Sequence, residues 1–161
     1  MQLDYGEFAF QQLHFYLAGT AAGLAFVGSP NADLNEVREF FPQAYLQSNQ
    51  ATVQAAADAL VSYLSGQTKT VDIPLVIHKG TDLHRQVWET LQTIPYGHTW
   101  DYSQLAQAVG QPTAVRAVAS AVGKNPLMLV IPCHRVVRKD GSLGGFRGGL
   151  PLKRQLLELE A

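Results

Sequence analysis

The sequence of 161 residues has a single cysteine, Cys133. One cysteine excludes an internal disulfide framework and a structural zinc site built from several cysteines, and it is typical of a reducing compartment. Charged residues are also few, at 16%, whereas hydrophobic residues make up 47%. This balance lies far from the composition of disordered chains, and it predicts one large folded domain or two small ones.

Long hydrophobic runs are lacking as well. Residues 8–32 carry no formal charge, but their apolar part, residues 15–28, is interrupted by Gly19, Thr20 and Gly23. It is too short to cross about 30 Å of hydrocarbon, so no membrane association is expected. Because Arg38 is the first basic residue, no positively charged start of a signal peptide is present. The sequence therefore predicts a cytoplasmic protein, associated with the nucleoid if the source is bacterial.

Positive charge is unevenly distributed along the chain. Residues 1–80 contain three basic and seven acidic residues, whereas residues 116–154 contain eight basic residues and one acid, Asp140. The second region could face the phosphate backbone of a nucleic acid.

Hydrophobic periodicity changes near residue 80. Before this point, alternation over 13–17 and an apolar run over 24–27 predict a small antiparallel sheet. Helices are expected over 31–41 and 49–64, and a further strand over 74–78. The first domain, residues 1–79, is therefore predicted to be a small α/β domain.

Helical spacing dominates after residue 80. We expect one helix over 83–94, a second capped by Asp101 with Gln104 in a capping-box position, and a third capped by Thr113 and ending at Gly123. A buried strand or extended segment over 127–131 and a last helix over 150–160 follow. The predicted class is α+β, with a mainly helical second domain, residues 80–161, that contains a winged-helix-like helix-turn-helix.

The third helix of this domain has an unusual face. Arg116, Ala119 and Ser120 lie opposite the stripe formed by Val115, Val118 and Val122. One arginine among small side chains permits close approach to a large partner. Alanine is also a good helix former, so a purely structural interpretation stays open.

Cys133 lies next to His134 and Arg135, an electropositive setting that favours the nucleophilic thiolate. A lone cysteine is otherwise most often buried and inert. Because neighbouring side chains in extended backbone point to opposite faces, His134 can serve Cys133 only across a local turn or through a water molecule.

Downstream, residues 141–149 contain five of the 14 glycines, which favours a loop whose backbone can approach a ligand. The loop has neither a phosphate-binding lysine motif nor a dinucleotide motif, and His14, His78, His84 and His98 lack metal-ligand spacing. No cofactor and no metal are expected.

The segment Pro132-Cys133-His134-Arg135-Val136, preceded by Asn125-Pro126, resembles the active-site signature of the O6-alkylguanine-DNA alkyltransferases, also called methylated-DNA-protein-cysteine methyltransferases. Other motifs fall at the family's spacing over residues 81–161, namely Pro95-Tyr96-Gly97, Asp101-Tyr102, Val115-Arg116-Ala117-Val118, Gly148-Gly149 and residues 153–160. Over residues 1–80 the resemblance is only general.

This resemblance implies a DNA repair activity in which the Cys133 thiolate attacks the alkyl carbon on O6 of a damaged guanine in duplex DNA. The sulfur keeps the alkyl group as a thioether, so each molecule acts once, as a monomer and without a cofactor. O4-alkylthymine is a second candidate lesion. A base in duplex DNA hides this carbon, so the nucleotide must be flipped out of the helix.

The family roles implied for single residues are as follows. His134 resembles the base that acts on Cys133 through water, and Glu160 the carboxylate that orients it, as in a catalytic triad. Asn125 resembles the hinge between the DNA-binding helices and the active site. Tyr102 resembles the donor to guanine N3 that also rotates the phosphate, and Arg116 the arginine that fills the vacated stack.

The resemblance also implies a set of substrate and DNA contacts. The carbonyls of Cys133 and Val136 would accept the exocyclic amine of the base, and the amide of residue 147 would donate to O6. The full set is Tyr102, Ala114, Arg116, Ala117, Ala119, Ser120, Arg135, Val136, Phe146 and Arg147.

Three residues depart from the family pattern. Arg147 stands where a small hydroxyl residue is frequent, Phe146 where tyrosine is common, and Met128 where some relatives have proline or a small residue. The preferred size of the alkyl group therefore stays open.

Three other functions compete with this one. An alkyltransferase-like damage sensor would carry tryptophan at the nucleophile position, where this chain has Cys133. A transcriptional regulator would need polar base-reading side chains on its recognition helix, which Ala114, Ala117 and Ala119 do not supply. A Cys-His hydrolase would need multiple turnovers and an oxyanion hole.

Overall fold

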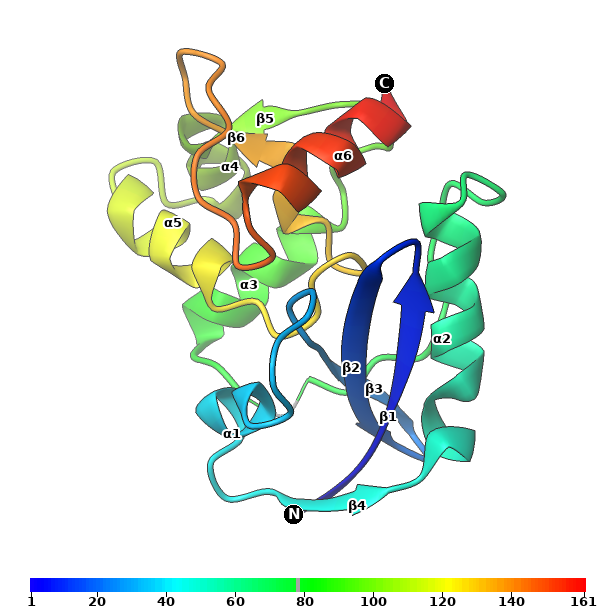
Figure 1. Ribbon diagram of the computed structural model, residues 1–161. Helices are drawn as coiled ribbons and strands as arrows, with labels where there is room; N and C mark the ends of the chain where they lie inside the picture. Colours follow the sequence, from blue (N-terminus) through cyan, green and yellow to red (C-terminus); the bar gives the residue numbers. More distant parts are fainter. Residues whose placement is uncertain (78) are drawn as a thin grey trace. The chain divides into compact units, whose positions relative to one another are not determined.

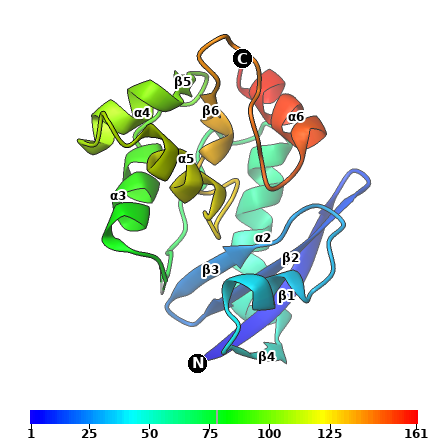
Figure 2. The same ribbon diagram turned by 90° about the vertical axis from the view of Figure 1, so that its left-hand side faces the viewer.

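A computed structural model describes residues 1–77 and 79–161 of the chain. The chain divides into two compact units, Met1–His78 and Lys79–Ala161. Figures 1 and 2 show the elements of each unit from two directions.

The first unit is a four-stranded sheet with one helix on each face. The strand order is β3-β2-β1-β4, where β1 is Gln2–Phe10, β2 Leu13–Thr20, β3 Gly23–Val27 and β4 Tyr45–Ser48. The first three strands pair antiparallel, as expected, whereas β4 pairs parallel with β1. The two helices are α1, Glu36–Phe40, and α2, Gln50–Leu64.

Strand alternation assigns a different hydrophobic set to each face of the sheet. Leu3 packs with Ala18, Phe26 and Val37 on the face that carries α1. On the other face, Gly6 lets the sheet approach α2, because a Cβ at Gly6 would lie 2.6 Å from Val53 Cγ2. Each helix therefore buries one face of the sheet, as the side-chain period of two requires (Figure 2).

Two expectations for this unit were wrong in extent. The helix expected over 31–41 is limited to Glu36–Phe40, because Asn31 adopts a positive φ of 60° and bonds to the backbone of His14 instead. The strand expected over 74–78 is a single bridge between Leu24 and Leu75, and His78 lies outside the described residues.

The second unit is mainly helical. Its helices are α3 Asp82–Leu91, α4 Tyr102–Val109, α5 Val115–Gly123 and α6 Leu150–Glu160, with a 3₁₀ helix at Cys133–Arg135. The strands β5 Trp100–Asp101 and β6 Val136–Val137 form a short parallel pair. Trp88 of α3 is fully buried and donates from Nε1 to the carbonyl of Ala121 at 2.9 Å, which ties α3 to α5.

The helix caps and the extended segment predicted for this unit were partly correct. The capping box of Asp101 and Gln104 is present at the start of α4. The cap predicted at Thr113 is wrong, because Thr113 lies in the turn and Ala114 is the residue that precedes α5. The strand or extended segment expected over 127–131 is a buried turn in which Leu129 has a φ of 74°. Within the described parts of the chain, no helix has the length and apolar character needed to cross a membrane.

Candidate active site

The backbone after α5 places Cys133 at the start of a 3₁₀ turn. Asn125 is buried and bonds to both ends of the turn that precedes Cys133: its Oδ1 accepts from the Leu127 amide at 2.9 Å, and its Nδ2 donates to the Ile131 carbonyl at 3.0 Å. The Cys133 amide then donates to Ile131 at 2.7 Å. Asn125 thus links the end of α5 to the cysteine, the location at which a hinge was expected.

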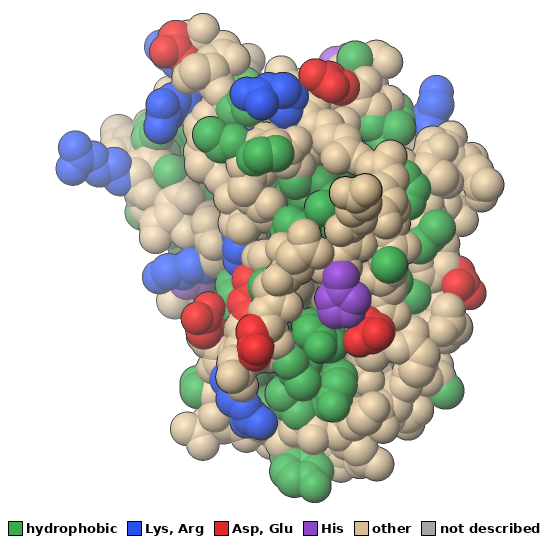
Figure 3. All heavy atoms as spheres, in the orientation of Figure 1, with side chains coloured by type: hydrophobic (Ala, Val, Ile, Leu, Met, Phe, Trp, Pro, Cys, Tyr) green, Lys and Arg blue, Asp and Glu red, His purple; other side chains and the backbone are tan. Residues whose placement is uncertain are grey.

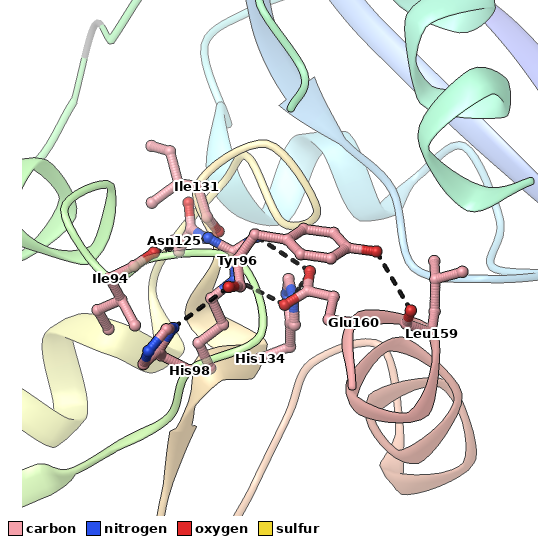
Figure 4. Close-up of polar contacts among 9 residues, drawn as sticks. Ile94, Tyr96, His98, Asn125, Ile131, His134, Leu159 and Glu160 are labelled. Atoms are coloured by element: carbon pink, nitrogen blue, oxygen red, sulfur yellow. Dashed lines mark hydrogen bonds and ion pairs between the residues drawn. The ribbon is translucent and has the colours of Figure 1, made fainter. Parts of the chain in front are cut away.

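A 3₁₀ helix turns the chain by about 120° per residue, so consecutive side chains are not opposed as in a strand. His134 and Arg135 consequently both reach Glu160, the last residue of α6. Figure 4 shows His134 beside Glu160. His134 Nε2 lies 2.8 Å from Glu160 Oε2, and Arg135 contacts the same carboxylate through Nε at 2.8 Å and Nη2 at 3.0 Å.

Two further contacts fix this cluster. Arg135 Nη1 donates to the carbonyl of Ile94 at 2.7 Å, and its guanidinium lies 5.7 Å from the centre of the Tyr96 ring. The Tyr96 hydroxyl donates to the Leu159 carbonyl at 3.2 Å (Figure 4). The loop after α3 therefore anchors the end of α6 that carries Glu160.

The side chain of Arg135 lies in the interior of the second unit, not on its DNA-facing surface as the resemblance implies. The family resemblance places it among the substrate and DNA contacts, but its side chain is buried and its guanidinium is bonded within the unit. A chain that must bury Glu160 needs a positive partner for it, because an isolated buried carboxylate is very costly. Arg135 supplies that partner.

Burial and the charges of the cluster together determine the protonation state of His134. Burial lowers the pKa of His134 below its ordinary value, although the Glu160 carboxylate acts in the opposite direction. Arg135 already balances Glu160, so a protonated His134 would add an uncompensated buried charge. His134 is therefore neutral at pH 7 and able to accept a proton.

Cys133 is held as a thiol in the resting protein. Burial raises the pKa of the Cys133 thiol, while the Asn125 amide and the positive charges of Arg147 and Lys153 act to lower it. A neutral thiol needs a proton acceptor before it can attack an alkyl carbon. In a neutral imidazole one ring nitrogen donates and the other accepts. Because His134 Nε2 is directed at the Glu160 carboxylate and donates to it, Nδ1 is the nitrogen that can accept the Cys133 proton.

A pocket of about 190 Å³ adjoins the thiol. Its lining residues come from α4, α5, the cysteine turn and the glycine-rich loop, and they are Tyr102, Ala119, Val122, Gly123, Asn125, Cys133, Gly145, Phe146 and Arg147. Burial and the nearby Cys133 raise the pKa of Tyr102, so its phenol keeps the proton that a donor needs. Met128, the departure that left the pocket width open in the sequence, is fully buried and is not one of these described lining residues.

Gly148 shapes the loop that closes this pocket. A Cβ at Gly148 would lie 2.7 Å from Phe146 Cε2 and 3.0 Å from Leu152 Cδ2, so a side chain there would displace Phe146. The Phe146 ring packs edge-on against His134, with 6.4 Å between ring centres. Val136, which follows the cysteine turn, is buried.

Helix α5 presents the small-residue face predicted from the sequence. Arg116, Ala117 and Ser120 are exposed, Ala114 and Ala119 are half-buried, and Val118 packs inside. Ala119 belongs to both this face and the pocket, so the exposed side of α5 leads directly to Cys133.

Lys153 is a site residue that the sequence reasoning missed. It is fully buried in α6, where its Nζ donates to the carbonyls of Val136 at 2.7 Å, Gly145 at 3.2 Å and Leu143. Burial lowers the pKa of Lys153 to about 8. In the sequence it belongs only to a segment that matches the family, because a lysine in a helix pattern gives no sign of whether it is buried.

The site combines a thiol, a neutral histidine and a buried carboxylate with a pocket beside an exposed helix. Comparison with known proteins identifies the class of protein to which such a site belongs. The family model described as the DNA-binding domain of 6-O-methylguanine DNA methyltransferase matches residues 82–161. The inducible methylated-DNA-protein-cysteine methyltransferase of Bacillus subtilis is 42% identical over 155 residues, which cover 94% of this chain and 86% of that protein. The chain belongs to this family.

Two further relatives define the extent of the similarity. The structure of Mycobacterium tuberculosis OGT in complex with DNA matches with a TM-score of 0.84 at 34% identity, over 98% of this chain and 92% of that one. The bifunctional transcriptional activator and DNA repair enzyme Ada of Escherichia coli is 44% identical over 136 residues, which cover 84% of this chain but 38% of Ada. The fold expected from the sequence, α+β with a mainly helical second part, is confirmed by the match to the Mycobacterium tuberculosis structure.

Proposed function

We propose that this protein repairs O6-alkylguanine in double-stranded DNA by transferring the alkyl group to its own Cys133 in a single turnover. The single observation that carries this proposal is the buried Cys133 thiol, which lines the pocket beside the His134–Glu160–Arg135 cluster. The names of the relatives and the complex of one of them with DNA support the same reaction.

The proposed reaction needs only residues of this chain. His134 accepts the Cys133 proton, directly or through a water molecule, and Glu160 holds the histidine ring in the tautomer that can do so. Cys133 Sγ then bonds to the alkyl carbon while the bond from that carbon to O6 breaks. Tyr102 donates to the guanine as negative charge develops on it, and the thioether that remains on Cys133 is a poor leaving group.

DNA recognition is assigned to the second unit. Residues 80–161 form the catalytic and DNA-binding domain, with the small-residue face of α5 against the duplex and Arg116 in the space left by the flipped base. A small face lets the backbone of α5 approach the DNA closely. Residues 1–79 form the amino-terminal α/β domain, and the protein works as a cytoplasmic monomer.

Intact mass before and after exposure to a duplex that contains O6-methylguanine tests this function. We expect one added methyl group per molecule on Cys133 and no further turnover. Cys133→Ala should abolish the mass gain and still bind the lesion, because the pocket and α5 remain. A Cys133→Ala protein that gains the methyl group, or a parent that releases it and turns over repeatedly, would refute the assignment.

A further inference from the structure

Arg147 is the one side chain with a formal charge among the nine described residues that line the Cys133 pocket. Its Nη2 donates to the Asn125 carbonyl at 3.3 Å, a long hydrogen bond to a neutral group. This bond holds the guanidinium next to the residue that positions the cysteine turn. Arg147 therefore adds positive charge to the cavity that would receive an alkylated base.

The other two cations near the thiol, Lys153 and Arg135, are held by hydrogen bonds to other groups of the second unit. Lys153 is bonded to three carbonyls, and Arg135 is bonded to Glu160 and to the Ile94 carbonyl. Neither of them lines the pocket. Any preference of the pocket for the charge of its occupant must therefore come mainly from Arg147.

We propose that Arg147 makes this protein select O6-alkyl groups that carry a negative charge, such as carboxymethyl, over uncharged groups of the same size. The proposal rests on the proposed function, since it assumes that Cys133 takes alkyl groups from O6 of guanine. It explains the arginine at position 147, where the family often has a small hydroxyl residue, as a feature that selects one class of substrate.

The physical reason is a repulsion that Arg147 removes. A carboxymethyl group brings its carboxylate close to the sulfur that must become a thiolate, and two negative charges in a pocket of low polarity oppose the reaction. A guanidinium offers several donors in a planar fork that matches a carboxylate, and it also favours the Cys133 thiolate. A neutral substituent gains only the second effect.

The chemical step is balanced without any co-reactant. The thiol proton leaves Cys133, Sγ bonds to the methylene carbon, and the bond from this carbon to O6 breaks with its electron pair passing to the guanine. One proton returns to the base, so the products are guanine and S-carboxymethyl-cysteine. The carboxylate is unchanged throughout.

The test compares three duplexes that contain O6-carboxymethylguanine, its uncharged isostere O6-carbamoylmethylguanine, or O6-methylguanine. Single-turnover rate constants are measured at saturating duplex for the parent, Arg147→Gln, Arg147→Lys and the surface control Arg138→Gln. Intact mass identifies the group on Cys133. The quantity compared is the ratio of the carboxymethyl rate to the carbamoylmethyl rate within each protein, which cancels changes in DNA affinity or folded fraction.

We expect the parent to favour the carboxymethyl duplex, and Arg147→Gln to reduce the ratio by about 10-fold to 100-fold, the range for a charged hydrogen bond. Arg147→Lys should keep part of the preference, because it keeps the charge. Arg138→Gln should keep all of it. A parent without this preference, or an Arg147→Gln protein with the parental ratio, would overturn the proposal. Methyl transfer to Cys133 in the parent, measured in the same series, reports separately on the proposed function.

Discussion

Glu160 ends α6, where the helix dipole already disfavours a negative charge, and its carboxylate is shared between His134 and Arg135. The sequence alone suggested a pair of Glu160 and His134. The structure adds Arg135 as a third member, and this changes the expected titration. Burial lowers the pKa of His134, and Arg135, which neutralises the carboxylate, acts in the same direction.

Arg135→Met tests this arrangement at the residue scale. In the parent, the pKa of His134 lies below its ordinary value of 6.5, so the histidine is neutral at pH 7 and the transfer rate should fall only at lower pH. Without Arg135, Glu160 acts on His134 alone and the pKa of His134 rises. The acid limb of the rate profile should therefore move to higher pH. Breaking a buried ion pair should also cost about 3 kcal/mol or more of stability.

Single-turnover rates from pH 5 to pH 9 and denaturant unfolding provide the two measurements for this prediction. Arg138→Met is the matched control, because Arg138 is exposed and lies three residues from Arg135. An acid limb at the same pH in the parent and in Arg135→Met would show that Arg135 has no influence on His134.

At the scale of elements, Lys153 connects α6 to the glycine-rich loop and to β6. Its ammonium donates to three backbone carbonyls, of which that of Val136 belongs to a buried residue, whereas Leu143 is half-buried and Gly145 is exposed. A buried carbonyl without a donor is costly, so loss of the bond to Val136 in Lys153→Met should destabilise the second unit by about 1–3 kcal/mol at pH 7, and loss of the bonds to Leu143 and Gly145 should loosen the loop over the pocket.

The pH dependence of this difference has a definite sign. The pKa of Lys153 is lowered to about 8 from 10.5, so between these values the unfolded chain binds more protons than the folded one. The stability of the parent relative to Lys153→Met should therefore rise with pH from about 8 to 10.5, by at most about 1.4 kcal/mol per unit. Urea unfolding of both proteins across this range tests the prediction, and a difference that falls with pH would contradict it.

Helix α5 provides a second prediction at this scale. If Arg116 replaces the flipped base, Arg116→Ala should slow repair of a duplex more than the reaction with free O6-benzylguanine, which requires no flipping. The ratio of the two rates is the measurement, with Ser120→Ala as a neighbouring change on the same exposed face. An equal reduction on both substrates would remove this role from Arg116.

At the scale of the whole molecule, the excess of basic residues between Arg116 and Arg154 is smaller on the surface than in the sequence. Of the eight, Arg135 and Lys153 are buried and Arg147 lines the pocket. The exposed ones are Arg116, Lys124, Arg138, Lys139 and Arg154. Figure 3 shows Lys and Arg side chains, in blue, protruding at the upper left of the view.

The salt dependence of DNA binding should reflect these exposed residues alone. Removal of one side chain that binds a phosphate should reduce the slope of log K against log salt by about 0.9. Arg138→Ala or Lys139→Ala should cause at most this change, whereas Arg135→Met should leave the slope unaltered if the protein remains folded. Fluorescence anisotropy with an undamaged duplex at several salt concentrations measures the slopes, and a slope near that expected for eight bound phosphates would contradict this interpretation.

The sequence by itself determined the class of the fold, the family and the chemical groups available for the reaction. Local signals such as the Asp101 capping box and the alternation in β2 depend on residues within a few positions, so they could be recognised without a structure. Helix extents were less predictable where a distant group intervenes, as His14 does for Asn31.

Only the tertiary structure decided which charged residues belong to the interior. The bond of Arg135 to Ile94 spans 41 positions, the bonds of Glu160 to Arg135 span 25, and that of Lys153 to Val136 spans 17. A buried and an exposed arginine are identical in sequence, because the stabilisation that permits burial comes from partners that folding brings together. For this reason Arg135 and Lys153 form part of the internal framework of the site, while Arg147, in the loop between them, contributes its charge to the pocket.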